Sequence, residues 1–150
     1  MKTAIVTGAA RGIGLATTRL FVESGWQVGM IDRDGATLAD AVATLDHVHG
    51  IDCDVSHADE VEEMVAETLD RFGAIDALVN NAGVADFGPI EETTFERWRT
   101  VMETNLDGPF LCTQAATPAL KASKGSIVNI ASISGLRAST LRVAYGTSKA

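Results

Sequence analysis

The chain has 150 residues, of which 46% are hydrophobic and 21% charged, a balance that suits one globular domain and excludes a disordered chain. Its net charge is −8 with no cluster of lysines or arginines, which argues against nucleic acid and anionic membranes as partners. The first apolar run, Ala4–Val6, is too short for the apolar region of a signal peptide, and no later run reaches about eighteen apolar residues. With only two cysteines as well, we expect a cytoplasmic protein without a disulfide framework.

Five short apolar runs alternate with longer segments of helical period. In chain order the runs are Ala4–Val6, Val28–Ile31, Val48–Ile51, Ala77–Val79 and Ser126–Ile130. None alternates cleanly between polar and apolar residues, which is typical of strands covered on both faces of a parallel sheet. The repeated strand–helix–strand order therefore predicts an α/β fold with a doubly wound parallel sheet and right-handed crossovers.

Apolar faces with a period of 3.6 residues predict helices between these strands. The faces comprise Ile13, Ala16, Leu20 and Phe21, then Leu38, Ala41, Val42 and Leu45, and then Val61, Met64, Val65, Leu69 and Phe72. Ser56 is the expected N-cap of the third helix. A long helical stretch, bent or broken, is expected over about Phe95–Ala122, and Gly25, Gly73 and Gly125 are expected to end helices.

The first strand leads directly into a glycine-rich turn and then a helix. The turn reads Thr7-Gly8-Ala9-Ala10-Arg11-Gly12-Ile13-Gly14. Its glycines let the backbone turn tightly and approach a ligand, and the helix start offers free N–H groups and a positive dipole end. In this context the turn predicts a site for the pyrophosphate of a dinucleotide, with a simple tight turn as the alternative.

Asp32 ends the second strand, eighteen residues after Gly14. A carboxylate here can accept hydrogen bonds from the adenosine ribose and repel a 2′-phosphate, whereas the simpler interpretation is a strand-end Asp that starts a turn. Arg11 and Arg33 argue the other way, since either could reach a 2′-phosphate. Because the carboxylate of Asp32 is expected to lie closer to the ribose than either arginine, we expect NAD to be preferred, with NADP possible.

Tyr145 is the only tyrosine, and Lys149 follows it by four residues, a spacing that puts both side chains on one face of a helix. A nearby ammonium favours the phenolate form and makes the hydroxyl a usable proton donor or acceptor. Ser132 follows the last apolar run, where its hydroxyl could hydrogen-bond an oxygen on which charge develops. The structural alternatives are a solvated helix face for the pair and a polar strand-end cap for Ser132.

Together these features resemble the short-chain dehydrogenase/reductase family. The matching residues follow the family's order over the whole chain and comprise Thr7-Gly8 to Gly12-Ile13-Gly14, Asp54, Asn80-Asn81-Ala82-Gly83, Asn105, Ser132, Tyr145 and Lys149. The resemblance implies a three-layer Rossmann fold. It also implies an oxidoreductase that transfers a hydride between a nicotinamide cofactor and a secondary alcohol or ketone, with no metal.

The resemblance implies a role for each of four catalytic residues. Tyr145 would be the acid/base that moves the alcohol proton. Lys149 would favour the ionised phenol and hold the nicotinamide ribose. Ser132 would orient the substrate oxygen, and Asn105 would fix a water in a proton relay that ends at the lysine. A polar break in a helix is the structural alternative for Asn105.

It likewise implies a cofactor site along the chain. Asp54 and Val55 would contact the adenine, and Asn81 would stabilise the central strand. The residues implied to bind the cofactor are Gly8, Arg11, Gly12, Ile13, Gly14, Asp32, Asp54, Val55, Asn81, Ala82, Gly83, Tyr145 and Lys149. Asp54 also suits a helix-start cap, and the Asn80–Gly83 segment an ordinary turn.

Members of this family continue well past the position of Lys149. The resemblance therefore implies that residues 1–150 form a nucleotide-binding domain that is incomplete at its C-terminus, with the last strand at a sheet edge and one of its faces partly uncovered. We expect little or no turnover from the 150-residue chain alone. A homo-oligomer, dimer or tetramer, is also implied, joined through the long helices that include Phe95–Ala122.

Two other functions fit part of the pattern. A non-catalytic NAD-binding module is one, although mere binding needs no proton-relay residues. The other is a sugar-nucleotide epimerase or dehydratase, which tends to have a Gly-x-x-Gly-x-x-Gly turn that differs from the Gly8, Gly12 and Gly14 spacing. The three histidines and Cys53 form no spacing typical of a metal site. The substrate is left open among sugars, steroids, acyl thioesters, polyols and small ketones.

Overall fold

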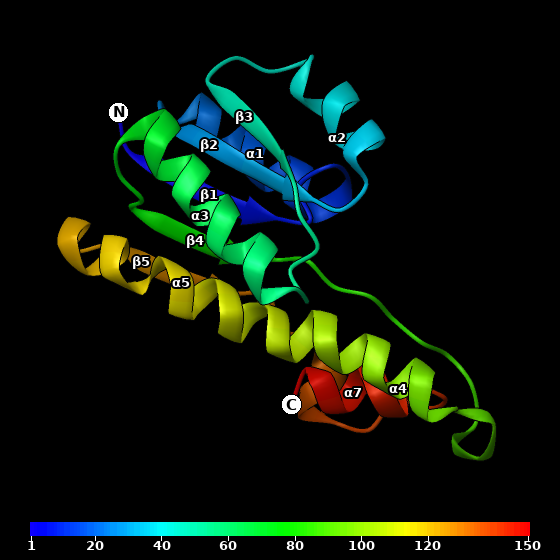
Figure 1. The fold of residues 1–150 in the computed structure, drawn as a ribbon. Helices are drawn as coiled ribbons and strands as arrows, with labels where there is room; N and C mark the ends of the chain where they lie inside the picture. The colour runs from blue at the N-terminus through cyan, green and yellow to red at the C-terminus, as the bar shows by residue number, and fades with distance from the viewer.

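The structure is a computed structural model that describes all residues from Met1 to Ala150, and it contains one parallel five-stranded sheet between two layers of helices (Figure 1). The strands are β1 (Thr3–Thr7), β2 (Gln27–Asp32), β3 (Val48–Asp52), β4 (Ala77–Asn80) and β5 (Ser126–Asn129). They lie in the order β3-β2-β1-β4-β5, and every neighbouring pair is parallel. The predicted doubly wound α/β fold is confirmed, and the order reverses between β1 and β4.

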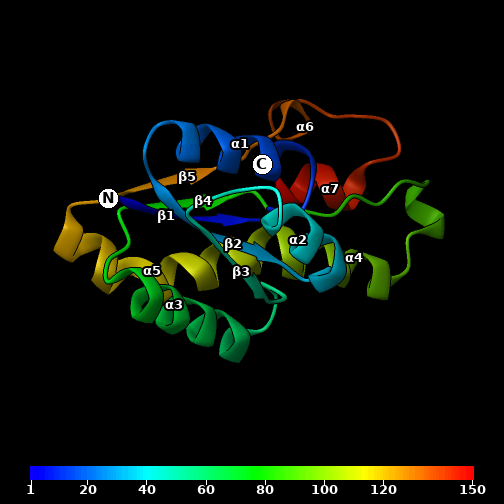
Figure 2. The same ribbon diagram turned by 90° about the horizontal axis from the view of Figure 1, so that it is seen from above.

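The helices cover both faces of this sheet. They are α1 (Gly12–Glu23), α2 (Gly35–Val42), α3 (Ala58–Phe72), the 3₁₀ helix η1 (Ile90–Glu92), α4 (Phe95–Met102), the π-helix η2 (Glu103–Asp107), α5 (Gly108–Ser123), α6 (Ile133–Leu136) and α7 (Val143–Ser148). Figure 2 shows α1 and α2 on one face and α3 and α5 on the other. None of the helices combines the length and apolar character needed to cross a membrane.

Alternate residues of the strands feed two separate cores. Ile5 and Leu78 belong to the core under α3 and α5, whereas Val6 and Met30 belong to the core under α1 and α2. All residues of β1 and β4 are buried, which explains why these strands appear in the sequence as unbroken apolar runs. The last strand differs, because every residue of β5 is exposed at the edge of the sheet, whereas only one partly uncovered face was predicted.

The apolar face predicted for α1 was wrong. Ile13 and Leu20 are 64% and 65% exposed, whereas Gly14 and Thr18 are buried. The helix approaches the sheet through these small residues, and the Thr18 hydroxyl donates to the carbonyl of Gly14 at 3.0 Å. Of the predicted face only Phe21 packs against the core, together with Leu15 and Val22.

The apolar face predicted for α3 is confirmed, but its N-cap is not. Val61, Met64 and Val65 are buried against the sheet. His57, not Ser56, occupies the N-cap position, and its side chain makes no capping hydrogen bond. The Ser56 hydroxyl donates instead to the carboxylate of Asp54 at 2.7 Å, which draws it away from the helix start.

The long helical stretch is confirmed, with a break of a defined kind. Between α4 and α5 the chain forms the π-helical turn η2, and Asn105 is buried in its middle. Gly25 and Gly73 follow helix ends as predicted, with φ values of +81° and +82°. At the end of α5 the left-handed position is taken by Lys124, with φ +57°, instead of the predicted Gly125. Both views show α7 lying beside α4, away from the main sheet (Figures 1 and 2).

Candidate active site

A cavity of about 570 Å³ opens at the carboxyl ends of the strands, where the strand order reverses. Among the predicted cofactor residues, its lining includes Gly8, Arg11, Ile13, Asp32, Asp54, Val55, Asn81, Ala82 and Gly83. The lining also contains residues absent from that prediction, namely Ile31, Arg33, Asp34, Cys53, Val84 and Thr104. Gly12, Gly14, Tyr145 and Lys149 do not contribute to it. The cavity thus gathers most of the predicted cofactor residues.

The glycine turn lies tightly against the segment that follows β4. Gly8 has φ +65°, and a Cβ built on it would lie 2.9 Å from the Cα of Ala82. A Cβ on Gly14 would collide with the carbonyl oxygen of Gly8. Arg11 is the N-cap of α1 and makes no capping hydrogen bond, so no side chain occupies the first amides of the helix. The turn therefore fits a pyrophosphate group at the start of α1.

Asn81 ties this turn to the end of β4. Its side-chain amide donates to the carbonyls of Thr7 at 2.9 Å and Gly8 at 3.2 Å. The Thr7 hydroxyl accepts hydrogen bonds from the backbone amides of Asn81 and Ala82, each at 3.0 Å. These bonds cross between β1 and β4, so the two sides of the cavity floor hold each other in place.

The Asp32 carboxylate spans two turns at the cavity wall. One oxygen accepts from the amide of Ala10 at 3.0 Å, and the other from the amide of Asp34 at 3.1 Å. The turn-forming interpretation of Asp32 is therefore seen directly. Since the same residue lines the cavity, it also presents negative charge where the sequence predicts the adenosine ribose.

Two arginines at the cavity are each engaged by a carboxylate other than Asp32. Arg11 forms an ion pair with Asp34, and Arg33 approaches Asp54 at 3.4 Å. Asp34 also caps α2 by accepting hydrogen bonds from the amide and hydroxyl of Thr37 at 3.1 and 2.8 Å. These bonds from Thr37, together with the charge of Arg11, lower the pKa of the Asp34 carboxyl.

Asp54 joins the cavity to a polar chain at the start of α3. Its amide donates to Glu60 at 2.7 Å, and the other oxygen of Glu60 lies 2.7 Å from the ring of His57. The bond from the Asp54 amide lowers the pKa of Glu60, and the bond to Glu60 raises the pKa of His57. Burial alone would raise the pKa of Asp54, but hydrogen bonds from Ser56 bring it below its ordinary value.

The predicted catalytic pair is carried by the short helix α7. Tyr145 lies within this helix and is half-buried, and Lys149 is its C-cap. The Lys149 ammonium donates to the carbonyl of Ile130 at 2.9 Å, just beyond β5. Ser132 is the N-cap of α6, where its hydroxyl accepts from the amide of Ser134 at 3.2 Å. Ser132 is thus a helix cap rather than the strand-end cap considered as an alternative, because β5 already ends at Asn129.

Asn105 connects α7 to the segment after β4. Its side-chain amide donates to the carbonyl of Val84 at 2.8 Å and to the hydroxyl of Ser148 at 2.9 Å, and its oxygen accepts from the Val84 amide at 2.8 Å. A Cβ built on Gly83 would lie 3.4 Å from the Asn105 oxygen and 3.8 Å from the Lys149 ammonium nitrogen. Because Gly83 lines the cavity, Asn105 and Lys149 lie beside its wall.

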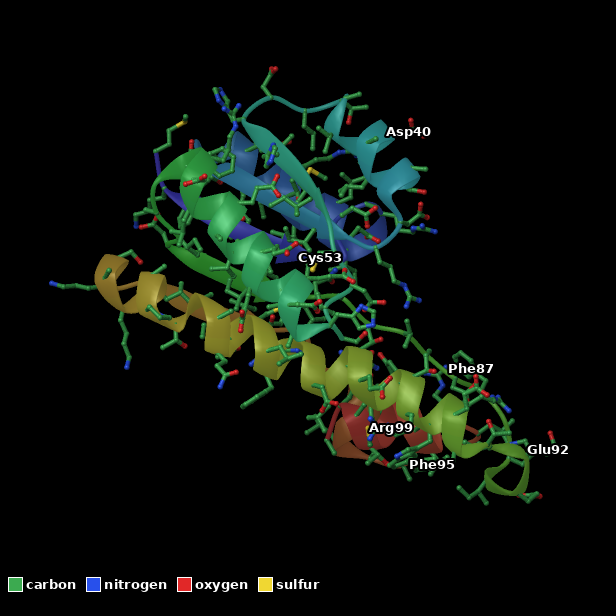
Figure 3. The ribbon with its side chains drawn as sticks, in the orientation of Figure 1. Asp40, Cys53, Phe87, Glu92, Phe95 and Arg99 are labelled. Atoms are coloured by element: carbon green, nitrogen blue, oxygen red, sulfur yellow. The ribbon has the colours of Figure 1, made fainter.

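No three His, Cys, Asp or Glu side chains lie together in a way that would hold a metal ion. Cys53 follows β3 at the cavity end of the sheet (Figure 3), and Cys112 lies on α5. Both thiols are free and buried, and burial raises the pKa of each to about 12. Both side chains pack in the core under α3 and α5.

Comparison with known proteins identifies the family. Residues 2–150 match the family described as short chain dehydrogenase, and the chain belongs to that family. It is 37% identical to a 3-oxoacyl-[acyl-carrier-protein] reductase of Synechocystis sp., with 99% of this chain and 63% of the relative aligned. It is 38% identical to an L-fucose dehydrogenase of Oryctolagus cuniculus, with 99% of this chain and 52% of the relative aligned.

Solved structures agree with the fold. A short-chain dehydrogenase/reductase of Brucella melitensis, described as a glucose/ribitol dehydrogenase, superposes with a TM-score of 0.95 at 37% identity, covering 99% of this chain and 63% of that one. A short chain dehydrogenase/reductase of Burkholderia phymatum, in complex with NAD, gives 0.96 at 31% identity, covering 99% and 55%. The chain spans between 52% and 63% of the length of these relatives and structures.

Proposed function

We propose that this chain is the nucleotide-binding part of an oxidoreductase that prefers NAD and interconverts a secondary alcohol and a ketone. The observation that carries the proposal is the position of Gly83, which lines the cavity and adjoins both Asn105 and Lys149. A dinucleotide that follows the glycine turn would thus end beside the residues of the predicted proton relay. The names of the relatives, all dehydrogenases or reductases, support the reaction class.

NAD fits the cavity in this proposal. The pyrophosphate binds at the first amides of α1, and the adenosine ribose binds beside Asp32, with Asp54 and Val55 toward the adenine. The NAD complex of the Burkholderia phymatum neighbour supports this cofactor class. Bound nicotinamide supplies the hydride acceptor or donor, and the protein provides orientation and proton transfer.

The chain's own residues then handle the proton. The Tyr145 hydroxyl gives its proton to the ketone oxygen, and in the reverse direction the Tyr145 phenolate takes the proton of the alcohol. Lys149 stabilises the phenolate through its positive charge, and Ser132 donates a hydrogen bond to the substrate oxygen. Asn105 positions α7 through Ser148, whose hydroxyl donates to the carbonyl of Tyr145 at 2.8 Å.

Substitution of Tyr145 by Phe tests the assignment. In a catalytically active form of the protein we expect turnover of a secondary alcohol to fall by about 10²–10⁴-fold, while NADH binding is unchanged. Thr147→Ala is the matched control, because Thr147 is exposed on the same helix and its hydroxyl only contacts the carbonyl of Val143. Unchanged turnover in Tyr145→Phe would contradict the role of the phenol. NADH binding without turnover of any alcohol would favour the non-catalytic binding module.

We also propose that the protein is a homo-oligomer joined through α4 and α5. The helical stretch exposes three large apolar side chains, Phe95 at 75%, Leu106 at 54% and Phe110 at 63%. Figure 3 shows Phe95 at the start of α4, away from the sheet. A row of exposed apolar residues on long helices is typical of a protein interface. Sedimentation should give a dimer or tetramer that Phe110→Glu converts to a monomer, and a monomeric parent protein would contradict the proposal.

A further inference from the structure

The two arginines beside the proposed ribose site each form an ion pair with a carboxylate. Arg11 pairs with Asp34 and Arg33 with Asp54, while the contacts of Asp32 are to the backbone amides of Ala10 and Asp34. Asp32 therefore supplies repulsion for a 2′-phosphate but does not hold either arginine. The carboxylates that keep the arginines from a 2′-phosphate are those of Asp34 and Asp54.

We propose that Asp34 is a specificity-determining residue that excludes NADP by holding the guanidinium of Arg11. The proposal rests on the proposed function, because it requires that the cavity bind a dinucleotide. Guanidinium groups bind phosphate through paired N–H donors, so a free Arg11 would be the natural partner of a 2′-phosphate. Asp34 lines the same cavity and engages one terminal nitrogen of that guanidinium, and its carboxylate lies close to Asp32.

The exposure of the ion pair indicates where its effect lies. The side chains of Arg11 and Asp34 are 65% and 41% exposed. Ion pairs this open to water contribute little to folding stability, because solvent and salt screen them. The ion pair between Arg11 and Asp34 therefore contributes little to the stability of the fold. Its effect is on the charge that a bound ligand contacts at the cavity mouth.

Asp34→Asn is the decisive substitution, because it separates the charge of Asp34 from its structural role. Asp34 caps α2 through its bonds to Thr37, and an asparagine oxygen makes the same capping bond. The variant therefore keeps the helix start and releases Arg11. Asp40→Asn is the matched control, since Asp40 is exposed on the outer side of the same helix (Figure 3) and its substitution changes the net charge equally.

Binding, rather than activity, is the readout. NADH and NADPH are titrated by fluorescence, and 5′-AMP and 2′,5′-ADP by calorimetry, at low ionic strength. We expect Asp34→Asn to tighten NADPH and 2′,5′-ADP by about tenfold, a change worth about 1.4 kcal/mol, and to change NADH and 5′-AMP by less than about threefold. Asp40→Asn should leave all four unchanged, and adding Arg11→Gln to Asp34→Asn should remove the gain.

Three results would overturn the inference. They are an Asp34→Asn variant with no gain for the 2′-phosphate ligands, an equal gain in Asp40→Asn, or a gain that survives Arg11→Gln. The last two would assign the effect to general charge or to Arg33. If the unsubstituted protein binds neither NADH nor 5′-AMP, the proposed function itself fails, which is a different outcome from normal NADH binding without the expected gain.

Discussion

The cavity floor and the segment from β5 to α7 are stabilised in different ways. At the floor, β1 and β4 are wholly buried, and Thr7 and Asn81 join them through hydrogen bonds to backbone groups. The segment from β5 to α7 is far more open, with Leu136 at 85% exposure. The bonds of Lys149 to Ile130 and of Asn105 to Ser148 anchor its last helix.

In the proposed reaction, this difference separates nucleotide binding from proton transfer. The nucleotide side of the site is built into the hydrophobic core, so its geometry is fixed by folding. The proton-transfer side rests on a few polar contacts at the surface of the same sheet. Substitutions in the first region should therefore affect stability and binding, and those in the second should leave the fold nearly intact.

Gly14→Ala should have the largest effect on the nucleotide side. The new methyl group would collide with the carbonyl oxygen of Gly8, and overpacking of this kind costs about 1–3 kcal/mol. If this free energy destabilises the conformation of the turn that binds the nucleotide, the affinity for NADH drops by roughly 5–150-fold. Gly88→Ala is the control, since its Cβ would lie 3.4 Å from the flexible end of Arg97. NADH titration decides the matter, and equal affinities in the two variants would argue against a tightly fitted turn.

Asn81→Ala should destabilise the fold by about 2 kcal/mol, because it removes the donor to the carbonyls of Thr7 and Gly8. Urea unfolding followed by circular dichroism measures the loss. A change below about 0.5 kcal/mol would mean that water replaces the amide, and that the floor depends less on this side chain than its contacts indicate.

Lys149→Met should cost less, about 1 kcal/mol or below, although it removes the hydrogen bond to Ile130. Both residues are half-buried, so water reaches the released carbonyl. If this variant is destabilised as much as Asn81→Ala in the same urea experiment, the proposed difference in stability between the two regions is contradicted.

His57→Gln should show the smallest effect, and only as a function of pH. The raised pKa of His57 means that the folded state holds its proton more tightly, so its contribution is present at low pH and is lost as the pH rises through that pKa. Between about pH 5 and pH 8 the urea midpoint of the parent protein should fall relative to that of the variant. Salt should reduce the difference, since the pair with Glu60 is exposed. Parallel pH profiles would exclude the histidine as the cause.

Local signals in the sequence were sufficient for the strands and the glycine turn. Burial on both faces leaves contiguous apolar runs, and a tight turn before a helix requires glycine at fixed positions. The outward position of Ile13 and Leu20 had no such signal, because the close contact of α1 with the sheet decides it. Periodicity describes one helix and says nothing of how near its neighbours lie.

The candidate site was predictable where its residues fall in one motif. Gly83 and Asn81 lie together in the chain, whereas Thr104 reaches the cavity only through folding. The pairing of Arg11 with Asp34 joins residues 23 positions apart, and no sequence pattern specifies which carboxylate an arginine takes. The position of Asn105 in the helical break was visible, but its bond to Ser148 was not.

The two buried thiols allow the opening of the core under α3 and α5 to be measured by cysteine alkylation. Cys53 is 2% and Cys112 1% exposed, and at neutral pH almost none of either is ionised because their pKa values are raised to about 12. An alkylating reagent can modify them only when this layer opens. The rate of alkylation in native buffer therefore reports how often this layer opens. A nucleotide that binds the folded state should lower the alkylation rate.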